Sequence, residues 1–120
     1  MIDDEHDIQT IACIGLSLVN DWQVFTANSG KEGIAQAKAH PLDAILLDVM
    51  MPDMDGVATL KALRADATTR QIPIVFLTAK SRAVNRQALY ALGAQGVIHK
   101  PFDPTTLASQ IAGFLGWSLS

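Results

Sequence analysis

Two short apolar runs constrain the fold of this chain more than any other feature of its sequence. One covers residues 43–48 (Asp-Ala-Ile-Leu-Leu-Asp) and the other residues 72–78 (Ile-Pro-Ile-Val-Phe-Leu-Thr). The apolar residues in each run are continuous and do not alternate with polar ones, which is typical of a strand buried on both faces. Residues 23–27 and 96–99 are shorter candidates of the same kind. The sequence therefore predicts a sheet that is covered on both sides.

Helical patterns separate these predicted strands. Ser29 followed by Glu32 is a capping box, which predicts a helix that runs through Ala39. A further helix is expected to begin near Gly56, after a turn in which Asp53 and Asp55 have turn and helix-cap roles. Residues 8–19 are expected to form the first helix. Its buried face is predicted to consist of Ile8, Ile11, Ala12, Gly15 and Val19, which recur at helical spacing.

Capping residues in the sequence also mark where the fourth and fifth helices begin or end. Ser81 is a candidate N-cap for the fourth helix, and Gly93 is expected to end it. Asp103 followed by Pro104 predicts an N-cap and a first helical position for the fifth helix. Its buried face is predicted to consist of Leu107, Ile111, Phe114 and Leu115.

Strands that alternate with single helices imply right-handed crossovers and a parallel sheet with helices on both faces. A chain of 120 residues suits one such domain, so residues 1–120 are expected to form a single unit. Ligands of open α/β sheets bind at the carboxyl ends of the strands. The residues at which the predicted strands end are therefore the candidates for function.

Composition excludes several other classes of protein. The chain is 49% hydrophobic and 18% charged, which is too apolar for a disordered segment. Its formal charge of −3 opposes direct binding to nucleic acid. No apolar run approaches the ~20 residues of a membrane span, and the acidic start is unlike a signal peptide. A soluble cytoplasmic domain is expected.

Polar residues stand at four of the predicted strand ends. Asp3 and Asp4 end the first, Asp48 the third, Thr78 the fourth and Lys100 the fifth. Three carboxylates at one edge repel each other unless positive charge lies among them. Lys100 and a bound metal ion would supply that charge, and a site made of carboxylate oxygens suits Mg²⁺. The alternative is a network of ion pairs that binds no ligand.

At these positions the sequence resembles response-regulator receiver domains of bacterial two-component systems. Thr78 lies 30 residues after Asp48, and Lys100 lies 52 residues after it, as in that family. The resemblance extends over essentially the whole chain. The four blocks that carry it are Asp3-Asp4-Glu5, Leu47-Asp48-Val49-Met50-Met51-Pro52-Asp53-Met54-Asp55-Gly56, Leu77-Thr78-Ala79 and Lys100-Pro101-Phe102.

The resemblance implies a role for each of these residues. Asp48 would accept a phosphoryl group from a phosphohistidine and form an acyl phosphate. Lys100 would pair first with Asp48 and then with a phosphate oxygen, and Thr78 would hydrogen-bond another phosphate oxygen. The peptide bond between Lys100 and Pro101 is expected to be cis. The implied ligands of Mg²⁺ are Asp3, Asp4, Asp48 and the backbone carbonyl of Met50.

The family's fold is a flavodoxin-like, doubly wound, five-stranded parallel sheet in the order 2-1-3-4-5, with five helices. This sequence departs from the family pattern in two places. Met1 and Ile2 are the residues that precede the acidic pair, so the first strand is expected to be truncated. Val97 stands where the family often has Tyr or Phe as a rotameric switch, so the form of coupling from Thr78 is in doubt.

The implied function is a signalling switch, not an enzyme with turnover. Its implied partners are a sensor histidine kinase or phosphotransfer protein and a downstream protein or output domain. A homodimer through the fourth helix, fifth strand and fifth helix is a further implied interaction. No contact with nucleic acid or membrane is expected.

Three alternatives belong to other classes of protein. A pseudo-receiver would have this fold and bind partners without phosphorylation, but such modules lose one or more of the residues that are all present here. An aspartyl-phosphate phosphatase of the haloacid-dehalogenase type would need an acid where Met50 stands. A nucleotide-binding flavodoxin-like protein would need a Gly-rich or Ser/Thr-rich loop in place of Asp3-Asp4-Glu5.

Overall fold

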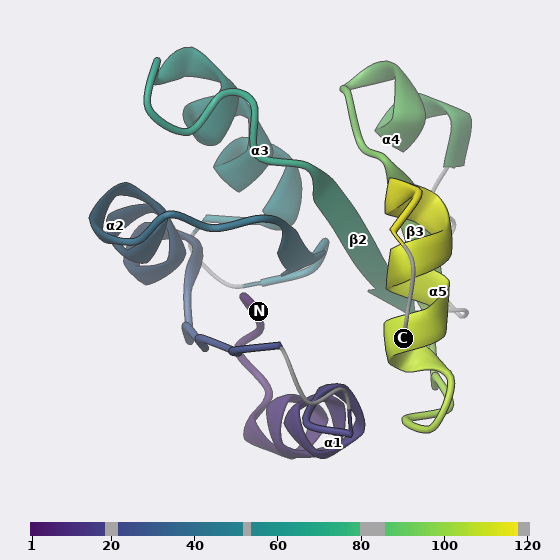
Figure 1. Cartoon of the computed structure of the whole chain (residues 1–120). Coiled ribbons are helices and arrows are strands. Elements are labelled where there is room, and N and C mark those ends of the chain that lie inside the picture. Colours follow the sequence, from purple (N-terminus) through teal and green to yellow (C-terminus); the bar gives the residue numbers. More distant parts are fainter. Residues whose placement is uncertain (19–21, 52–53, 80–85, 118–120) are drawn as a thin grey trace.

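The computed structural model describes residues 1–18, 22–51, 54–79 and 86–117, in which five helices surround a parallel sheet (Figure 1). The predicted α/β fold is confirmed. In chain order the elements are α1 (His6–Leu16), α2 (Gly30–Ala39), β1 (Ile45–Asp48), α3 (Gly56–Ala65), β2 (Ile74–Ala79), α4 (Arg86–Ala91), β3 (Gly96–Lys100) and α5 (Leu107–Leu115). None of the helices in the described ranges is long and apolar enough to cross a lipid bilayer.

The order of the sheet agrees with the prediction. Strand β2 lies between β1 and β3 and is parallel to both. Ile2 forms isolated parallel bridges to Ala27 on one side and to Leu47 of β1 on the other. The spatial order is therefore the segment at Ala27, the segment at Ile2, β1, β2 and β3, which is the predicted order 2-1-3-4-5. The first strand is truncated, as expected, because its pairing is confined to these bridges.

The predicted strand over residues 23–27 is wrong for all but its last residue. The N–H of Ala27 donates to the carbonyl of Met1 (2.9 Å), and the N–H of Asp3 donates to the carbonyl of Ala27 (3.1 Å). Residues 22–26 are irregular. A strand is defined by its ladder of hydrogen bonds, and the short segment at Ile2 supplies too few partners to extend that ladder. Apolar content alone could not reveal this.

Two apolar clusters cover the two faces of the sheet. Helices α1 and α5 pack together on one face, while α2, α3 and α4 cover the other (Figure 1). Phe76 of β2 is fully buried on the α2–α3–α4 face, and Leu77 is fully buried on the α1–α5 face. Neighbouring residues of one strand are thus buried on opposite sides, which explains the continuous apolar runs in the sequence.

Two predicted core positions are wrong. Ile11 of α1 is 41% exposed, and Phe114 of α5 is 37% exposed. Helix α5 also begins later than predicted, at Leu107. The carboxylate of Asp103 accepts from the N–H of Thr105 (2.9 Å) and from its hydroxyl (2.7 Å), so Asp103 closes a turn and does not cap the helix.

The predicted caps at Ser29, Asp55 and Gly93 agree with the structure, whereas α1 (His6–Leu16) begins and ends earlier than the predicted residues 8–19. Ser29 accepts from the N–H of Glu32 (3.1 Å) at the start of α2. Asp55 accepts from the N–H of Ala58 (2.8 Å) at the start of α3. Gly93 follows α4 with a φ of 104°, a left-handed conformation that favours glycine. The predictions for Val19, Asp53 and Ser81 lie outside the described residues.

Candidate functional site

Strand register brings the predicted site residues to one edge of the sheet. Asp48 is the last residue of β1 and pairs with Leu77, so Thr78 lies one residue beyond it on β2. Lys100 is the last residue of β3. On the other side of β1, the N–H of Asp48 donates to the carbonyl of Ile2 (2.9 Å), which places Asp3 beside it. The carboxylates of Asp3 and Asp48, the hydroxyl of Thr78 and the amine of Lys100 therefore lie at the same edge, where four parallel chain segments end.

Lys100 is the centre of an ion-pair network at this edge. Its Nζ lies 3.1 Å from Oδ2 of Asp3, 3.3 Å from Oδ1 of Asp48 and 3.6 Å from Oε1 of Glu5. The Asp3 side chain is fully buried, and the Lys100 side chain is 11% exposed. Ion pairs in so little water are screened weakly, so Lys100 holds the two buried carboxylates together.

More carboxylate is present than Lys100 alone can neutralise. Oxygen atoms of Asp3, Asp4, Glu5 and Asp48 all lie within 4.8 Å of one another. Oδ1 of Asp4 and Oδ2 of Asp48 are buried and accept no hydrogen bond from any described residue. Buried oxygens without a donor are costly unless a cation or water meets them. This donor set of hard oxygens fits Mg²⁺, which binds through one or two carboxylates and keeps several waters.

The pKa values of Asp48 and Lys100 are shifted by burial and by the charges around them. Burial is the main cause that raises the pKa of Asp48 from 3.8 to about 6, and the charge of Asp3 adds to it against the opposing effect of Lys100. Burial works against the charge on Lys100, but hydrogen bonding and attraction to Asp3 and Asp48 outweigh it and raise the pKa of Lys100. The pocket thus favours added positive charge.

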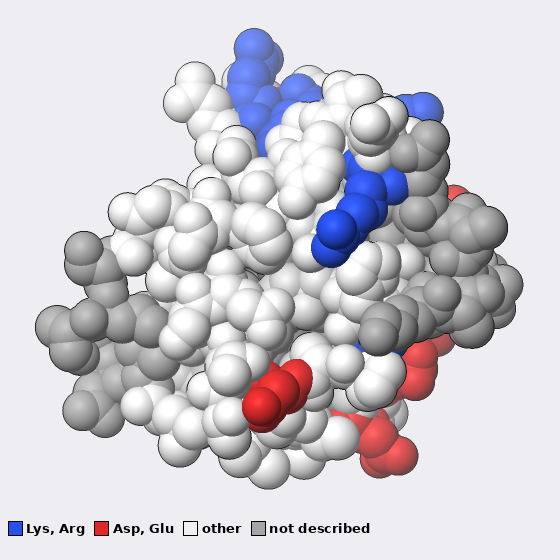
Figure 2. Space-filling view, turned by 90° about the vertical axis from the view of Figure 1, so that its right-hand side faces the viewer, with Lys and Arg blue, Asp and Glu red and all other residues white. Residues whose placement is uncertain are grey.

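Charged side chains are unevenly spread over one side of the molecule. In the space-filling view, most acidic side chains lie toward the lower edge and most basic ones lie toward the top (Figure 2).

Thr78 and Met50 occupy the remaining predicted positions. Thr78 is buried, and its Oγ1 has no hydrogen-bond partner among the described residues. The N–H of Met50 donates to Oδ1 of Asp48 (3.3 Å), which fixes the loop against the carboxylate. Val97, at the switch position, is buried in the α2–α3–α4 cluster.

The loop after β1 is held close to Asp48 by a glycine. The N–H of Gly56 donates to the carbonyl of Val49 (2.8 Å), and a Cβ at Gly56 would collide with the carbonyl oxygen of Asp48. At the other side of the site, the peptide bond between Lys100 and Pro101 is cis, as expected. Because Gly56 has no side chain, the start of α3 can lie directly against the end of β1.

The sequence analysis assigned no role to two residues that the structure places at the site, Glu5 and Gln9. Glu5 belongs to the acidic cluster and pairs with Lys100; its place directly after Asp3-Asp4 was the available signal. Gln9 is buried in α1, and its Nε2 donates to the carbonyls of Asp3 (2.6 Å) and Ala27 (2.7 Å). A single polar residue on a helix gives no sign that its amide will join two strands.

Comparison with known proteins supports one family. The family model described as "Response regulator receiver domain" matches residues 1–112. The chain is 35% identical over 115 residues to a probable transcriptional regulator, ycf27, of Cyanidium caldarium (96% of this chain, 45% of the relative). It is 33% identical over 115 residues to the alkaline phosphatase synthesis transcriptional regulatory protein PhoP of Bacillus subtilis (96% of this chain, 47% of the relative).

Solved structures agree with this. Chemotaxis protein CheY4 of Vibrio cholerae is similar with a TM-score of 0.84 at 33% identity, over 94% of this chain and 93% of that chain. A putative response regulator from Chloroflexus aurantiacus gives 0.86 at 29% identity, over 96% of this chain and 93% of that chain. The chain belongs to the response-regulator receiver domain family. It spans about half the length of the curated transcriptional regulators that it matches.

Proposed function

We propose that the chain is a phosphorylation-dependent switch whose acceptor is Asp48. The observation that carries the proposal is the buried carboxylate of Asp48, which has one oxygen held by Lys100 and the other, Oδ2, without a donor among the described residues. No described protein donor occupies Oδ2, so it is available for bonding. We further propose that residues 1–120 form one receiver domain.

Phosphoryl transfer asks the protein chiefly for positioning and for neutralisation of charge. Asp48 has a pKa of about 6 and is mostly ionised at pH 7, so it needs no general base. An oxygen of Asp48 would form a bond to phosphorus while the bond from phosphorus to the donor's imidazole nitrogen breaks, and the electron pair of that bond leaves with the imidazole. The product at Asp48 is an acyl phosphate.

Each neighbouring group has a separate task in this proposal. Asp3, Asp4, Asp48 and the carbonyl of Met50 would hold Mg²⁺, which when bound supplies positive charge to the phosphate oxygens. Lys100 already lies beside Asp48 and would exchange part of that contact for a phosphate oxygen. Thr78 has a buried hydroxyl without a partner among the described residues, so it can donate to a phosphate oxygen once the group is attached.

The same contact would convert phosphorylation into a change of shape. A hydrogen bond that forms in one state and not in the other shifts the balance between two conformations. Thr78 pairs with His99 on β3, two residues from Val97, so a shift of Thr78 on phosphorylation would act on this strand. Because valine has no ring to reorient, we propose that coupling proceeds through movement of backbone and packing.

We propose a sensor histidine kinase or phosphotransfer protein as the donor and a separate protein or output domain as the receiver of the signal. A homodimer through α4, β3 and α5 would be one form of output. Some relatives are named transcriptional regulators, but the charge of −3 on this chain argues that it does not itself contact nucleic acid. The proposed location is the cytoplasm, where such kinases act.

Intact-mass measurement after incubation with acetyl phosphate and Mg²⁺ tests the proposal. Wild type should gain the mass of one phosphoryl group, and Asp48→Asn should gain none. Asp55→Asn is the matched control, because it removes a nearby exposed carboxylate while asparagine still caps α3. It should label like wild type. Equal labelling of Asp48→Asn and wild type would remove Asp48 from its role, and absence of labelling in wild type would favour a pseudo-receiver.

A further inference from the structure

Two buried polar atoms on neighbouring strands lack hydrogen-bond partners beside the site. They are Oγ1 of Thr78 on β2 and Nδ1 of His99 on β3, and neither has a partner among the described residues. The two residues are partners in the parallel register of β2 and β3. Neighbouring strands lie only about 4.8 Å apart, and register partners direct their side chains to the same face of the sheet. The two atoms therefore belong to one local arrangement.

The burial of nearby residues shows which face of the sheet carries this pair. Val97, two residues before His99, is buried in the α2–α3–α4 cluster. Phe76, two residues before Thr78, is buried in the same cluster. Side chains two residues apart in a strand point to the same face. Thr78 and His99 therefore lie on the α2–α3–α4 face, on which α4 packs against β3.

His99 is separate from the ion-pair network around Lys100. Because Lys100 directly follows His99 in β3, its side chain leaves the strand on the opposite face. There it pairs with Asp3 and Asp48. His99 itself forms no ion pair with any acid in the described ranges. The imidazole is therefore not held by the charges of the site.

Thr78 has an apolar neighbour on one side and the imidazole on the other. The N–H of Val49 donates to the carbonyl of Leu77 (3.0 Å), which places Val49 beside Thr78 on the β1 side. Val49 is buried in the α2–α3–α4 cluster and has no polar side-chain atom. Across the described sheet, the polar side chain that flanks Thr78 is thus that of His99.

The hydroxyl of Thr78 can bond to a phosphate oxygen and to an imidazole at the same time. A hydroxyl has one donor and two acceptor lone pairs. When its proton is donated to a phosphate oxygen, its own oxygen can still accept. A neutral imidazole with its proton on Nδ1 is a donor at that atom. Hydrogen bonds in a chain polarise and strengthen one another, so the second bond is more favourable once the first has formed.

We propose that His99 is a positioning residue for Thr78: in the phosphorylated state Nδ1–H of His99 donates to Oγ1 of Thr78 while that hydroxyl donates to a phosphate oxygen. The inference rests on the proposed function of Asp48 and Thr78, and it names the side chain that carries their change of state to β3. It involves hydrogen bonds and the choice of imidazole tautomer, with no covalent step at His99. The contact acts together with the backbone movement proposed above.

This contact would change the surface next to α4. Thr78 is 1% exposed, whereas His99 is half-buried. A hydrogen bond that draws the imidazole toward the buried hydroxyl would alter what β3 presents beside α4. His99 would thus supply on β3 the ring that Val97 lacks.

Nitrogen NMR of the histidine rings tests the inference on the wild-type chain. The ¹⁵N-labelled full chain is compared at pH 8, where imidazole in water is neutral, with Mg²⁺ alone and with Mg²⁺ plus beryllofluoride, a mimic of the phosphoryl group. We expect beryllofluoride to move the ring signals of His99 to those of the Nδ1–H tautomer. A His99 variant, which lacks these signals, assigns them.

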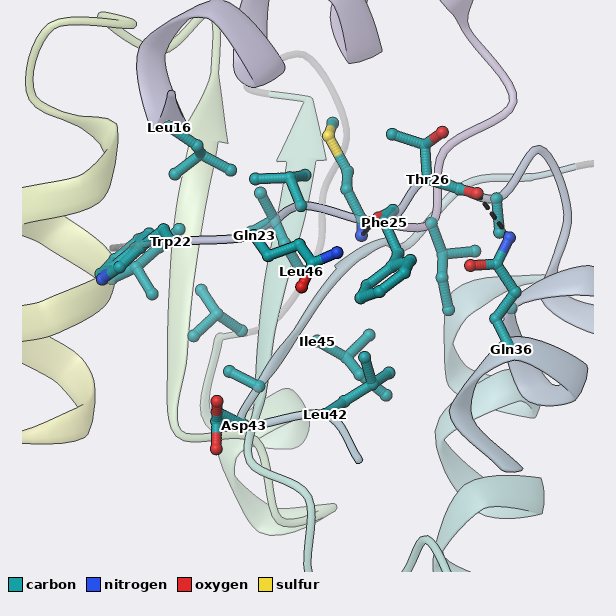
Figure 3. A pocket seen from close by; sticks show the side chains of 18 of the residues that line it. Leu16, Trp22, Gln23, Phe25, Thr26, Gln36, Leu42, Asp43, Ile45 and Leu46 are labelled. Carbon is teal, nitrogen blue, oxygen red and sulfur yellow. Dashed lines mark hydrogen bonds between the residues drawn. The ribbon is translucent and has the colours of Figure 1, made fainter. Parts of the chain in front are cut away.

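His40 is the internal reference in the same spectrum. Its ring stacks on that of Phe25, with the ring centroids 4.3 Å apart. Phe25 lines a cavity between residues 22–27 and the start of β1, away from the strand end that carries Asp48 (Figure 3). The ring signals of His40 should therefore stay in place when beryllofluoride is added.

Two substitutions separate the hydrogen bond from the space that the ring fills. The amide nitrogen of asparagine, like Nδ1 of histidine, is bonded to Cγ, so His99→Asn keeps a donor near that position, whereas His99→Val does not. In calorimetric titration with Mg²⁺ present, His99→Val should bind beryllofluoride about fivefold more weakly than wild type. His99→Asn should stay within about twofold of wild type. Mg²⁺ alone should bind all three proteins equally, because His99 lies on the other face from Lys100 and the acids.

Three results would overturn the inference while leaving the proposed function in place. They are unchanged ring signals of His99 in wild type that has bound beryllofluoride, movement of those signals to the Nε2–H tautomer, and equal beryllofluoride affinity of His99→Val and wild type. The first two are judged on wild type alone and do not depend on the folding of a variant. A wild type that neither binds beryllofluoride nor gains a phosphoryl group from acetyl phosphate would overturn the proposed function as well.

Discussion

Asp48→Asn should stabilise the metal-free protein at pH 7, although it removes the proposed acceptor. The ionised carboxylate of Asp48 is buried beside Asp3, and its pKa is raised from 3.8 to about 6 even with Lys100 in contact. A raised pKa means that the folded state favours the neutral form. Asparagine is neutral at every pH and can keep the hydrogen bond from the N–H of Met50.

The magnitude follows from that pKa. A tenfold change in proton affinity is worth about 1.4 kcal/mol, so a shift of this size makes ionised Asp48 cost the folded state at most about 3 kcal/mol. Between pH 3.8 and about 6 the folded state binds the proton more tightly than the unfolded chain does. Stability of wild type therefore falls, relative to the variant, as the pH rises through this window. Above it the difference stays constant.

Urea unfolding at intervals from pH 4 to pH 8, with EDTA present, measures this difference. We expect Asp48→Asn to exceed wild type by about 1–3 kcal/mol at pH 7 and to lose most of that advantage by pH 4. Asp55→Asn is the control; its carboxylate is exposed, and it should show no such window. A variant that is no more stable than wild type at pH 7, or an advantage independent of pH, would refute the electrostatic reasoning.

Three further substitutions test the supports of the site. Lys100→Met should lower stability at pH 7 by about 3 kcal/mol, because Asp3 and Asp48 lose their shared cation; a loss below about 0.5 kcal/mol in urea unfolding would argue against the ion-pair network. Gln9→Ala leaves the buried carbonyl of Asp3 without the donor that Gln9 supplies and removes one of the two donors to the carbonyl of Ala27, so it should cost about 2 kcal/mol by the same assay, whereas an unchanged midpoint would deny its bridging role. Ser29→Ala should cost about 1 kcal/mol, with phosphoryl labelling as in wild type; impaired labelling would show that the effect reaches the site.

The fold and much of the site could be predicted because they depend on local patterns. Continuous apolar runs fix where the inner strands lie, and parallel topology then brings their carboxyl ends together. Lys100 and Asp48 are 52 residues apart in the chain, yet each ends a strand, so their meeting at 3.3 Å follows from topology. The capping residues Ser29 and Asp55 were predictable for the same reason, since each acts within three residues of itself.

What could not be predicted depends on partners distant in the sequence. Residues 23–27 have the composition of a strand, but a strand also needs a neighbour, and the short segment at Ile2 supplies too little of one. The side chain of Gln9 joins Asp3 to Ala27 by hydrogen bonds, and no periodic pattern in the sequence predicts such a contact. Ile11 and Phe114 have helical spacing that suits burial, but neither lies in an apolar cluster of the described core.

Site mapping of the phosphorylated protein tests the central claim most directly. Wild type treated with acetyl phosphate and Mg²⁺ would be cleaved under acidic conditions and its peptides analysed by tandem mass spectrometry. The phosphoryl group should be found on the peptide that contains Asp48, and its amount should fall when Mg²⁺ is chelated beforehand. A phosphoryl group on Asp3, Asp4 or Asp55, or labelling that is indifferent to chelation, would contradict the assignment of Asp48 as the acceptor in a metal-dependent pocket.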